Sequence, residues 1–398
     1  MLRMAVVAHG RFHAFDLARE LRRLGHDVEL FSNYPAWAVE RFGVAGDGYH
    51  GLWLHGGAER VLGRLAPGAL HRTEALRHRW FGRWAAGQLV GRDWDVVIGW
   101  SGISEELLDS IALRARCRVL MRGSAHIAEQ AELLDAEARR TGAAIDRPSA
   151  WMVAREQREY HRADRIIVLS AFARASFERH GVAAHRLSVL PLGVDVERFR
   201  APAPALRSRV TRVLDGGPIR VLFVGTLSGR KGMRDLAAVT RRCAHLPMTF
   251  TLVGPQVPET RAVLGDPGPN VTILGRHAQD SLPAVYAQAD VFFFPTIEDG
   301  FGMVLTQAAA AGLVLLATGN CAAPELLAAG AQGWTVPVRD VDAMVERLEW
   351  CHANRTEFAA MLTRASVARR PRSWSDVAGA LAGMAQAWET MAEGPQPR

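Results

Sequence analysis

The stretch Val221-Leu-Phe-Val-Gly225-Thr-Leu-Ser-Gly-Arg-Lys-Gly232 passes from an apolar run into a glycine-rich turn. Apolar residues at helical spacing follow it, so the stretch predicts a buried strand, a tight turn and the start of a helix. Small residues in such a turn let backbone N–H groups approach an anion, and the helix N-terminus adds partial positive charge. We therefore predict a diphosphate site at Gly225, Thr226, Arg230 and Lys231.

Lys231 is the only lysine in the chain, although lysine and arginine together number 48. Arginine serves at every other basic position. The surviving lysine predicts a place where a compact ammonium is needed and a planar guanidinium would not fit.

Apolar runs of strand length recur on both sides of this stretch. We expect strands at residues 2–8, 26–32, 95–99, 118–121, 165–169, 187–190, 219–224, 249–253, 271–274, 290–295 and 313–317. Segments with apolar residues at helical spacing lie between these runs, and this alternation is typical of α/β domains with parallel sheets. Such domains bind ligands at the carboxyl ends of their strands, in the crevice between domains.

Residues 200–218 hold the densest loop signals, beginning Arg200-Ala-Pro-Ala-Pro and ending Gly-Gly-Pro218, and are the predicted boundary. A chain of 398 residues suits two domains. We predict one domain at 1–199, a second at 217–374, and a helical segment at 375–398 that returns toward the first domain.

A second strand-to-helix turn lies in Phe294-Pro-Thr-Ile-Glu-Asp-Gly-Phe-Gly-Met303. The backbone N–H groups of Gly300, Phe301 and Gly302 can bind hydroxyls or phosphate oxygens there. Asp299 at the lip can accept hydrogen bonds from sugar hydroxyls, and Gln307, one helical turn in, faces the same crevice.

Together these stretches resemble retaining GT-B glycosyltransferases of the group 1 / family 4 type, which include sucrose synthase-like and phosphatidylinositol mannosyltransferase-like enzymes. Aligned on Gly-Phe-Gly, Asp299 falls on the family's first glutamate and Gln307 on its second. The resemblance implies that Asp299 contacts the donor sugar, Gln307 the ribose and Lys231 the diphosphate. It also implies two facing Rossmann-like domains with a deep cleft between them, residues 1–199 on the acceptor side and residues 217–374 binding the nucleotide sugar.

The resemblance extends through most of the chain. Arg122-Gly-Ser-Ala-His126 is similar to the family segment whose histidine sits beside the donor sugar, which implies donor contacts for His126 and Arg122. Residues 155–170 are similar to the family's Glu…Ala-Asp…Ser signature, and Pro191-Leu-Gly-Val-Asp195 closes the first domain as it does in the family.

Three residues depart from the family pattern. Thr226 stands where an arginine is usual, Asp299 is one methylene shorter than glutamate, and the Gln307 amide cannot hold two ribose hydroxyls as a carboxylate does. The expected function is transfer of a hexose-type sugar from a UDP- or GDP-linked donor to a glycan, lipid-linked or small-molecule acceptor. A non-hydrolysing nucleotide-sugar epimerase and a catalytically silent nucleotide-sugar-binding protein remain alternatives.

Residues of the first predicted strand-to-helix loop are candidates for the acceptor side. His9, Gly10 and Arg11 either face the crevice or form a simple tight turn, and Asp16 either reaches the acceptor or caps the first helix. Glu325 matches a family glutamate but would also complement a helix dipole.

Catalysis is expected to need no metal and no cofactor. Lys231, Arg230, His126 and Asp299 are the predicted catalytic group, because nothing resembles an Asp-x-Asp metal site and fixed cations can stabilise a departing diphosphate. The four cysteines lie far apart, without a CxxC pair or close histidine pairing. That spacing argues against a zinc site and fits a reducing, cytoplasmic compartment.

Residues 59–92 form a basic stretch with seven arginines against Glu59 and Glu74, interleaved with Trp80, Phe81 and Trp84. It can contact an anionic membrane peripherally, bind another polyanion, or pack its aromatic face on the sheet. The chain carries a net charge of +7, but no nucleic-acid module is recognisable, so nucleic acid is not an expected partner.

Overall fold

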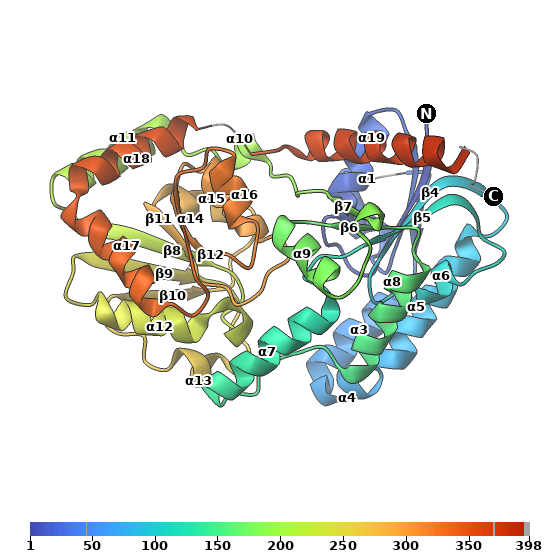
Figure 1. Cartoon of the computed structure of the whole chain (residues 1–398), viewed down its shortest axis with the longest axis horizontal. Coiled ribbons are helices and arrows are strands. Elements are labelled where there is room, and N and C mark those ends of the chain that lie inside the picture. Colours follow the sequence, from blue (N-terminus) through green and yellow to red (C-terminus); the bar gives the residue numbers. More distant parts are fainter. Residues whose placement is uncertain (45, 369–370, 394–398) are drawn as a thin grey trace.

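The computed structural model describes residues 1–44, 46–368 and 371–393, which fold into two α/β domains lying side by side (Figure 1). Residues 394–398 of the predicted tail lie outside the described residues. In both sheets the paired strands run parallel, as expected for strands joined by helical crossovers.

The N-terminal sheet has the order β3-β2-β1-β4-β5-β6-β7. Its strands are β1 (Arg3–Ala8), β2 (Asp27–Ser32), β3 (Tyr49–Gly51), β4 (Asp93–Trp100), β5 (Arg114–Met121), β6 (Arg165–Val168) and β7 (Leu187–Val189). The central strand β1 is buried from Met4 to Ala8, which explains its unbroken apolar run.

Helices cover both faces of this sheet. They are α1 (Ala14–Arg23), α2 (Ala36–Glu40), α3 (Trp53–Leu65), α4 (Pro67–Arg72), α5 (Glu74–Leu89), α6 (Glu105–Leu108), α7 (Ile127–Thr141), α8 (Ala150–Arg162) and α9 (Ala171–Arg179), with a 3₁₀ turn, η1 (Ala184–Arg186). The short helix α10 (Val196–Phe199) packs instead on helices of the C-terminal domain. The hydroxyls of Ser149 and Ser170 cap α8 and α9 by accepting hydrogen bonds from backbone N–H groups of the first turn.

The C-terminal sheet has the order β10-β9-β8-β11-β12-β13. Its strands are β8 (Ile219–Val224), β9 (Met248–Val253), β10 (Val271–Gly275), β11 (Val291–Phe294), β12 (Val314–Thr318) and β13 (Gly333–Val336). Its helices are α11 (Ala203–Leu214), α12 (Met233–Arg242), α13 (Thr260–Leu264), α14 (Leu282–Ala287), α15 (Met303–Ala310), α16 (Ala323–Ala328), α17 (Val341–Ala353) and α18 (Arg355–Val367), with a 3₁₀ turn, η2 (Gly229–Lys231).

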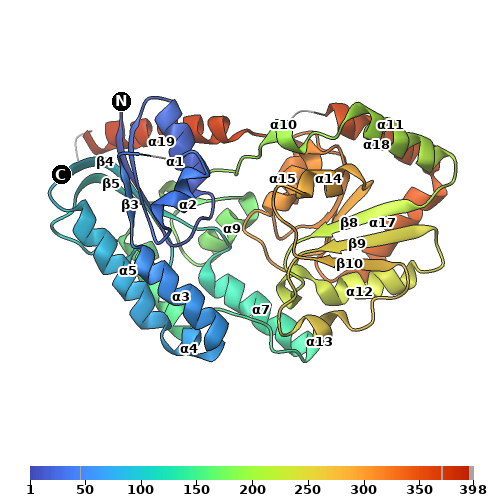
Figure 2. The ribbon, with the colours of Figure 1, turned by 180° about the vertical axis from the view of Figure 1, so that it is seen from behind.

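The last helix, α19 (Trp374–Glu393), leaves the C-terminal domain and packs on the N-terminal one. Figures 1 and 2 show it running beside α1 along one edge of the molecule. Trp374, Val377, Leu381, Ala385 and Trp388 recur at helical spacing and are buried in the core of the first sheet. Burial of each large side chain contributes about 1.5–3 kcal/mol, so α19 fastens the two domains together.

The predicted boundary segment differs from the prediction. Residues 203–214 form α11, which packs on α18, rather than a loop. Its one proline, Pro204, is tolerated because it lies in the first helical turn, where the N–H groups have no partner within the helix. The short edge strands β3 and β13 were not predicted, while the eleven predicted strands are present, with β5 beginning earlier, at Arg114.

Candidate active site

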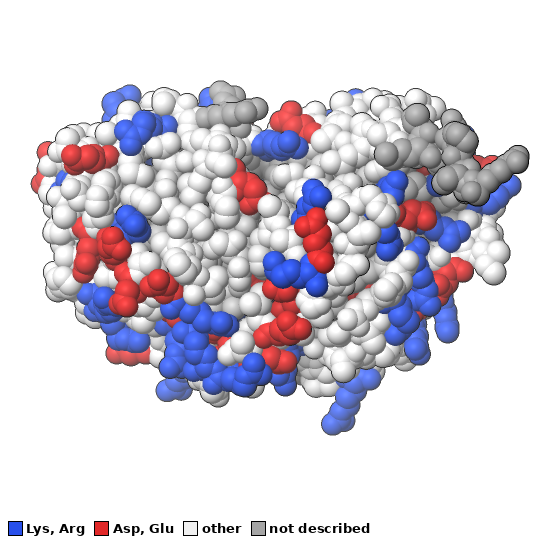
Figure 3. All heavy atoms as spheres, in the orientation of Figure 1, with Lys and Arg blue, Asp and Glu red and all other residues white. Residues whose placement is uncertain are grey.

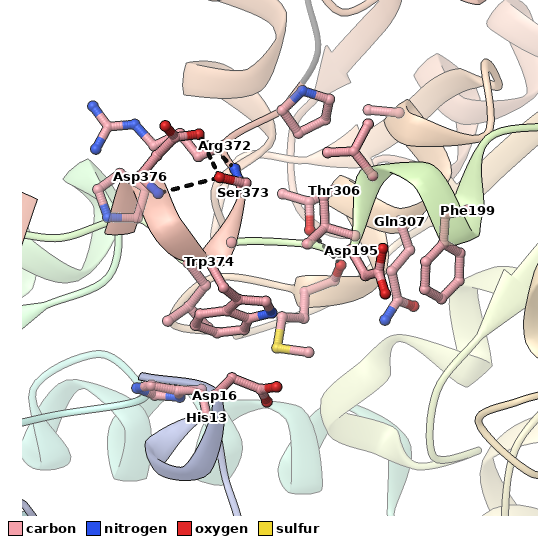
Figure 4. Close-up of a pocket in the computed structure, with 18 of the residues that line it drawn as sticks. His13, Asp16, Asp195, Phe199, Thr306, Gln307, Arg372, Ser373, Trp374 and Asp376 are labelled. Atoms are coloured by element: carbon pink, nitrogen blue, oxygen red, sulfur yellow. Dashed lines mark hydrogen bonds between the residues drawn. The ribbon is translucent and has the colours of Figure 1, made fainter. Parts of the chain in front are cut away.

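A cavity of about 2190 Å³ lies between the two domains. One wall comes from the start of α1, the opposite wall from α15 and α16, and a third side from the start of α19. Figure 4 shows His13 and Asp16 on one side, Thr306 and Gln307 across from them, and the Trp374 indole between. The cavity is therefore large enough for a nucleotide sugar and is bounded by both domains.

Five residues singled out in the sequence line this cavity: Arg11, Asp16, Phe301, Gln307 and Glu325. Gln307 is buried, and the Tyr286 hydroxyl donates a 3.0 Å hydrogen bond to its Oε1. Because the amide oxygen is engaged, the two N–H donors are the main hydrogen-bonding capacity left to Gln307. A family carboxylate at this position would offer acceptors instead.

Arg11 and Asp16 belong to the N-terminal wall. The Arg11 guanidinium lies 3.8 Å from the centroid of the Phe42 ring and donates a 2.9 Å hydrogen bond to Gln279 Oε1 of the other domain. Asp16 lies in the first turn of α1 and accepts a 2.9 Å hydrogen bond from Arg19. It does not cap the helix, so that alternative is excluded.

The two glycine-rich turns meet at the ends of the neighbouring strands β8 and β11. Gly232 has φ +73°, and a Cβ built on it would lie 1.9 Å from the Pro295 carbonyl oxygen, so only glycine allows this approach. The close approach places Lys231 Nζ 2.5 Å from Asp299 Oδ2. Two motifs far apart in the sequence thus form one charged pair.

Asp299 is held on both of its oxygens. Oδ1 accepts hydrogen bonds from the backbone N–H groups of Phe301 and Gly302, at 3.2 and 2.9 Å. Burial acts to raise the pKa of this carboxyl, but the charges of Lys231 and Arg230 outweigh it and lower the pKa. Asp299 is therefore an ionised acceptor at neutral pH.

Arg230 has a different partner, which the sequence did not reveal. Its guanidinium lies 2.8 Å from the fully buried Glu298 and donates a 2.9 Å hydrogen bond to the Ser124 hydroxyl of the N-terminal domain. Glu298 also accepts hydrogen bonds from Ala125 N and Gln130 Nε2, at 3.0 and 3.1 Å. Arg230 and Glu298 thus join the two domains at this point, and no short motif in the sequence marks Glu298.

The predicted diphosphate turn lies beside this interdomain contact rather than on the cavity wall. A Cβ on Gly229 would lie 2.4 Å from Ile145 Cδ1, and one on Gly300 would lie 2.3 Å from the Gly123 carbonyl oxygen. The Ser170 hydroxyl also donates a 2.7 Å hydrogen bond to the Gly300 carbonyl. Accordingly, seven of the predicted donor-site residues are not among the described residues that line the cavity: Gly225, Thr226, Arg230, Lys231, Asp299, Gly300 and Gly302.

His126 lies outside the lining of the cavity, as the predicted diphosphate turn does, so its donor contact stays a prediction. Its ring stacks on His180 at 4.3 Å between centroids and packs against Tyr160 and Phe177. Its Nδ1 accepts a 3.3 Å hydrogen bond from Ala128 N at the start of α7. Burial, with a contribution from His180, lowers the pKa to about 3. The imidazole is a neutral helix cap that lines a separate small hollow.

Arg122 is likewise engaged within the protein and lies outside the lining of the cavity. It donates 2.7 Å hydrogen bonds to Glu156 and Gln130 and a 3.1 Å bond to the Ala125 carbonyl. Burial acts to lower its pKa, but the Glu156 carboxylate outweighs it and raises the pKa. Arg122 therefore fixes the loop that carries Ala125, which in turn contacts Glu298.

Of the remaining loop residues, His9 and Gly10 lie outside the described lining of the cavity. Gly10 has φ +93°, and its N–H donates a 2.8 Å hydrogen bond to Asn33 Oδ1, as expected of a tight turn. His13, by contrast, lines the cavity although the sequence did not single it out. Burial lowers the pKa of His13 to about 3, so its ring is neutral there.

Two family models match this chain, one for each of the two domains. Residues 11–198 match the family described as Glycosyltransferase Family 4, and residues 218–354 match the family described as Glycosyl transferases group 1. The second region contains both glycine-rich strand-to-helix turns described above.

Curated relatives align with about half of the chain. It is 31% identical over 212 residues to the GDP-mannose-dependent alpha-(1-6)-phosphatidylinositol monomannoside mannosyltransferase of Mycobacterium tuberculosis, covering 50% of this chain and 55% of that protein. It is 34% identical over 196 residues to the phosphatidyl-myo-inositol mannosyltransferase of Mycolicibacterium smegmatis, covering 47% and 48%. The chain thus spans about half the length of these relatives.

Solved structures match over nearly the whole chain. HepE of Anabaena in complex with UDP superposes with a TM-score of 0.66 at 15% identity, covering 97% of this chain and all of that one. Sucrose-phosphate synthase of Thermosynechococcus elongatus gives 0.63 at 18% identity, covering 98% and 100%. At these identities the likeness establishes the fold, which is GT-B. Among the described residues, no helix is long and apolar enough to cross a membrane.

Proposed function

The chain belongs to the group 1 / family 4 glycosyltransferases, and from that premise we propose that it is a retaining hexosyltransferase. Its donor would be a UDP- or GDP-linked sugar, and its acceptor a glycan, a lipid-linked sugar or a small molecule. The observation that carries the proposal is the Lys231–Asp299 pair, set where two strand-to-helix turns meet. GDP-mannose in the name of the mycobacterial relative and UDP in the HepE complex support a nucleotide-sugar donor.

The proposed chemistry is stabilisation of a departing nucleoside diphosphate. Negative charge grows on the β-phosphate as the sugar leaves, so cations and N–H dipoles fixed beforehand lower the barrier. Lys231, Arg230 and the N-termini of α12 and α15 would supply them without a metal ion or cofactor. Asp299 would hold the Lys231 ammonium and accept hydrogen bonds from the sugar.

Donor binding would also require the domains to part. Arg230–Ser124 and Glu298–Ala125 close the space around the predicted diphosphate turn. Breaking these contacts would open the turn to the cavity, and closure over the donor would exclude water. Retention of anomeric configuration rests on the family resemblance, and we assign no enzymic nucleophile.

We place the enzyme in the cytoplasm, at the surface of an anionic membrane through its α3–α5 arm (residues 53–89). Phe81 is buried against the sheet and Trp84 is partly buried there. These two aromatic side chains therefore pack on the sheet, which was one of the alternatives for this stretch. A separate apolar set on the arm is exposed: Trp53, Leu54, Val61, Leu65, Leu76 and Trp80. Basic side chains project beside it, at the lower right of Figure 3, where Figure 1 places α4 and α5. This combination suits a peripheral contact with anionic lipids.

Ligand-dependent melting followed by donor turnover tests the proposal. UDP, GDP or ADP, or one of their sugars, should raise the melting temperature, because a ligand that binds only the folded state stabilises it. Incubation of that sugar donor with candidate acceptors should yield a glycoside of unchanged anomeric configuration by NMR. Isomerised donor without an acceptor would indicate the epimerase, and tight binding without turnover would indicate the silent protein.

A further inference from the structure

Three side chains with metal-binding atoms converge in the N-terminal domain, outside the donor cavity. His9 directly follows β1, and His55 and Glu59 lie one turn apart on the same face of α3. His9 Nε2 is 2.8 Å from Glu59 Oε2, and His55 Nδ1 is 3.8 Å from the same oxygen. All three ligand atoms lie within 4.8 Å of one another.

The buried His55 ring shows which of its nitrogens is available. Its Nε2 lies 3.0 Å from the Arg77 carbonyl oxygen, which can only accept, so Nε2 carries the proton. Nδ1 therefore presents a lone pair, and it is buried without a hydrogen-bond partner. Only 1% of His55 is exposed, so water does not readily supply the missing partner. A buried polar atom left unpaired is costly unless a ligand occupies it.

We propose that His9, His55 and Glu59 bind one Zn²⁺ ion. Tetrahedral zinc with ligand bonds of 2.0–2.1 Å places neighbouring ligand atoms about 3.3 Å apart. The two separations from Glu59, 2.8 and 3.8 Å, lie on either side of that value, and the two histidine atoms lie within 4.8 Å of each other, so side-chain rotations would have to bring the three atoms to that spacing. Two imidazoles and one carboxylate suit zinc better than magnesium or calcium, which prefer oxygen ligands. The fourth position is left for water.

Contacts around the three residues suit a metal site. The Arg77 carbonyl fixes the His55 tautomer, and ligating histidines commonly donate their second N–H in this way. The Arg77 guanidinium pairs with Glu59 Oε1, and Asn33 Nδ2 donates a 3.3 Å hydrogen bond to Oε2. The ion would tie the end of β1 to α3, and through Arg77 to α5. It would thereby fix the α3–α5 arm to the sheet, a role independent of the proposed transferase chemistry.

A second group in the chain serves as a control. Glu129, Glu132 and His180 also lie close enough to share an ion, but Glu132 is exposed and the group contains one imidazole. His50 pairs with Glu29 at 2.7 Å in the same domain without a second histidine. Variants His180→Gln and His50→Gln therefore remove an imidazole beside a carboxylate without touching the proposed ligands.

Zinc titration of the full chain, untagged and stripped with chelator, tests the proposal. We expect one Zn²⁺ per chain by competition with a chromophoric chelator, and a higher melting temperature with zinc than without. His9→Gln and Glu59→Gln should weaken zinc binding at least tenfold and abolish the thermal shift, whereas His180→Gln and His50→Gln should retain both. Cobalt added to the wild-type chain should give the visible absorption of a tetrahedral site, a readout that needs no variant.

Two results would overturn the site. One is wild-type chain that takes up no zinc, or only several weakly bound ions. The other is uptake that His9→Gln and Glu59→Gln leave unchanged, or that His180→Gln removes instead. If a ligand variant does not fold, octahedral rather than tetrahedral cobalt absorption in the wild-type chain would count against the proposal.

Discussion

Lys231 Nζ lies 2.5 Å from Asp299 Oδ2, although 68 residues separate the two in the sequence. Each side chain keeps a fraction of its surface exposed, 16% for Lys231 and 19% for Asp299. The pair is therefore neither a loose surface contact nor sealed in the core. It is held by glycine turns and remains within reach of a ligand once the domains part.

Asp299→Ala should damage sugar transfer more than binding of the free nucleotide, because Asp299 is assigned to the sugar. Loss of a hydrogen bond to a charged group is worth about 1.5–3 kcal/mol, which corresponds to roughly ten- to a hundredfold in rate. Turnover with the nucleotide sugar and affinity for UDP or GDP measure the two effects separately. An equal loss in both would reassign Asp299 to the nucleotide.

The stabilising part of this contact should depend on pH. The folded state lowers the pKa of Asp299, so its ionised form contributes stability above the ordinary pKa of the group. That contribution is lost as the pH falls through the lowered value. Asp299→Asn should therefore lower the melting temperature at pH 7, and its difference from wild type should shrink as the pH falls below the ordinary pKa of the group. A difference that persists at acid pH would point to packing instead of charge.

Glu298→Ala should destabilise the interdomain contact, since it leaves Arg230 and the Ala125 N–H without their buried partner. Breaking a buried pair in this way costs about 3–5 kcal/mol. Calorimetry should show a lower melting temperature, and small-angle scattering a larger radius of gyration. The exposed Glu346→Gln is the control, and equal effects of the two changes would refute the interdomain role.

Turnover should persist in excess EDTA at a temperature well below the melting transition. Cations from the chain replace a divalent ion in the proposed leaving-group chemistry. Complete loss restored by magnesium or manganese would contradict that chemistry. If only zinc restores turnover, and if Glu59→Gln prevents that restoration, the loss in EDTA would instead come from the proposed zinc site beside α3.

Leu65→Glu should weaken binding to anionic vesicles, because Leu65 is 81% exposed on the α3–α5 arm and would meet the lipid surface. Co-sedimentation with vesicles of phosphatidylglycerol and phosphatidylcholine measures the effect, and salt should reduce binding. Val367→Glu alters a comparably exposed side chain at the end of α18, in the other domain. Binding that both variants lose equally, or that neutral vesicles match, would argue against the arm.

The sequence predicted what depends on local pattern. The β8–η2–α12 and β11–α15 turns were found because apolar runs, glycines and a helix start follow one another within a few residues. Since carboxyl ends of neighbouring parallel strands share one edge of a sheet, the fold class also placed the two turns at one edge, although the Lys231–Asp299 contact itself was not predicted.

What the sequence missed depends on side-chain direction across the domain boundary. His126 and Arg122 occupy the expected loop, but His126 turns into an aromatic cluster and Arg122 toward Glu156. Glu298 precedes Asp299 directly and points the opposite way, into Gln130 and Ala125. Glu298 and Asp299 are adjacent acidic residues in the same loop, so the local sequence pattern cannot tell their roles apart. Only the packed structure shows that Glu298 makes the interdomain contact and that Asp299 is the donor-site candidate.

The histidine cluster shows the same limit. The wide spacing of the four cysteines, without a close histidine, argued against a zinc site, yet His9 and His55 lie with ring centroids 5.3 Å apart. They meet because the end of β1 faces α3, a tertiary contact between segments more than forty residues apart. Short-range metal motifs cannot reveal ligands brought together in this way.

Turnover of Lys231→Arg tests the central claim most directly. The substitution keeps the charge but replaces a compact ammonium with a broad planar group beside Asp299 and Gly232. Removal of a donor aimed at transition-state charge costs about 3–4 kcal/mol in comparable sites, or roughly a hundredfold or more in rate. We predict that Lys231→Arg loses most transferase activity and Lys231→Ala at least as much, while both remain folded at 25 °C. If Lys231→Arg turns over donor at the wild-type rate, the proposed role of Lys231 is contradicted. The diphosphate would then have to be bound by Arg230 and the backbone alone.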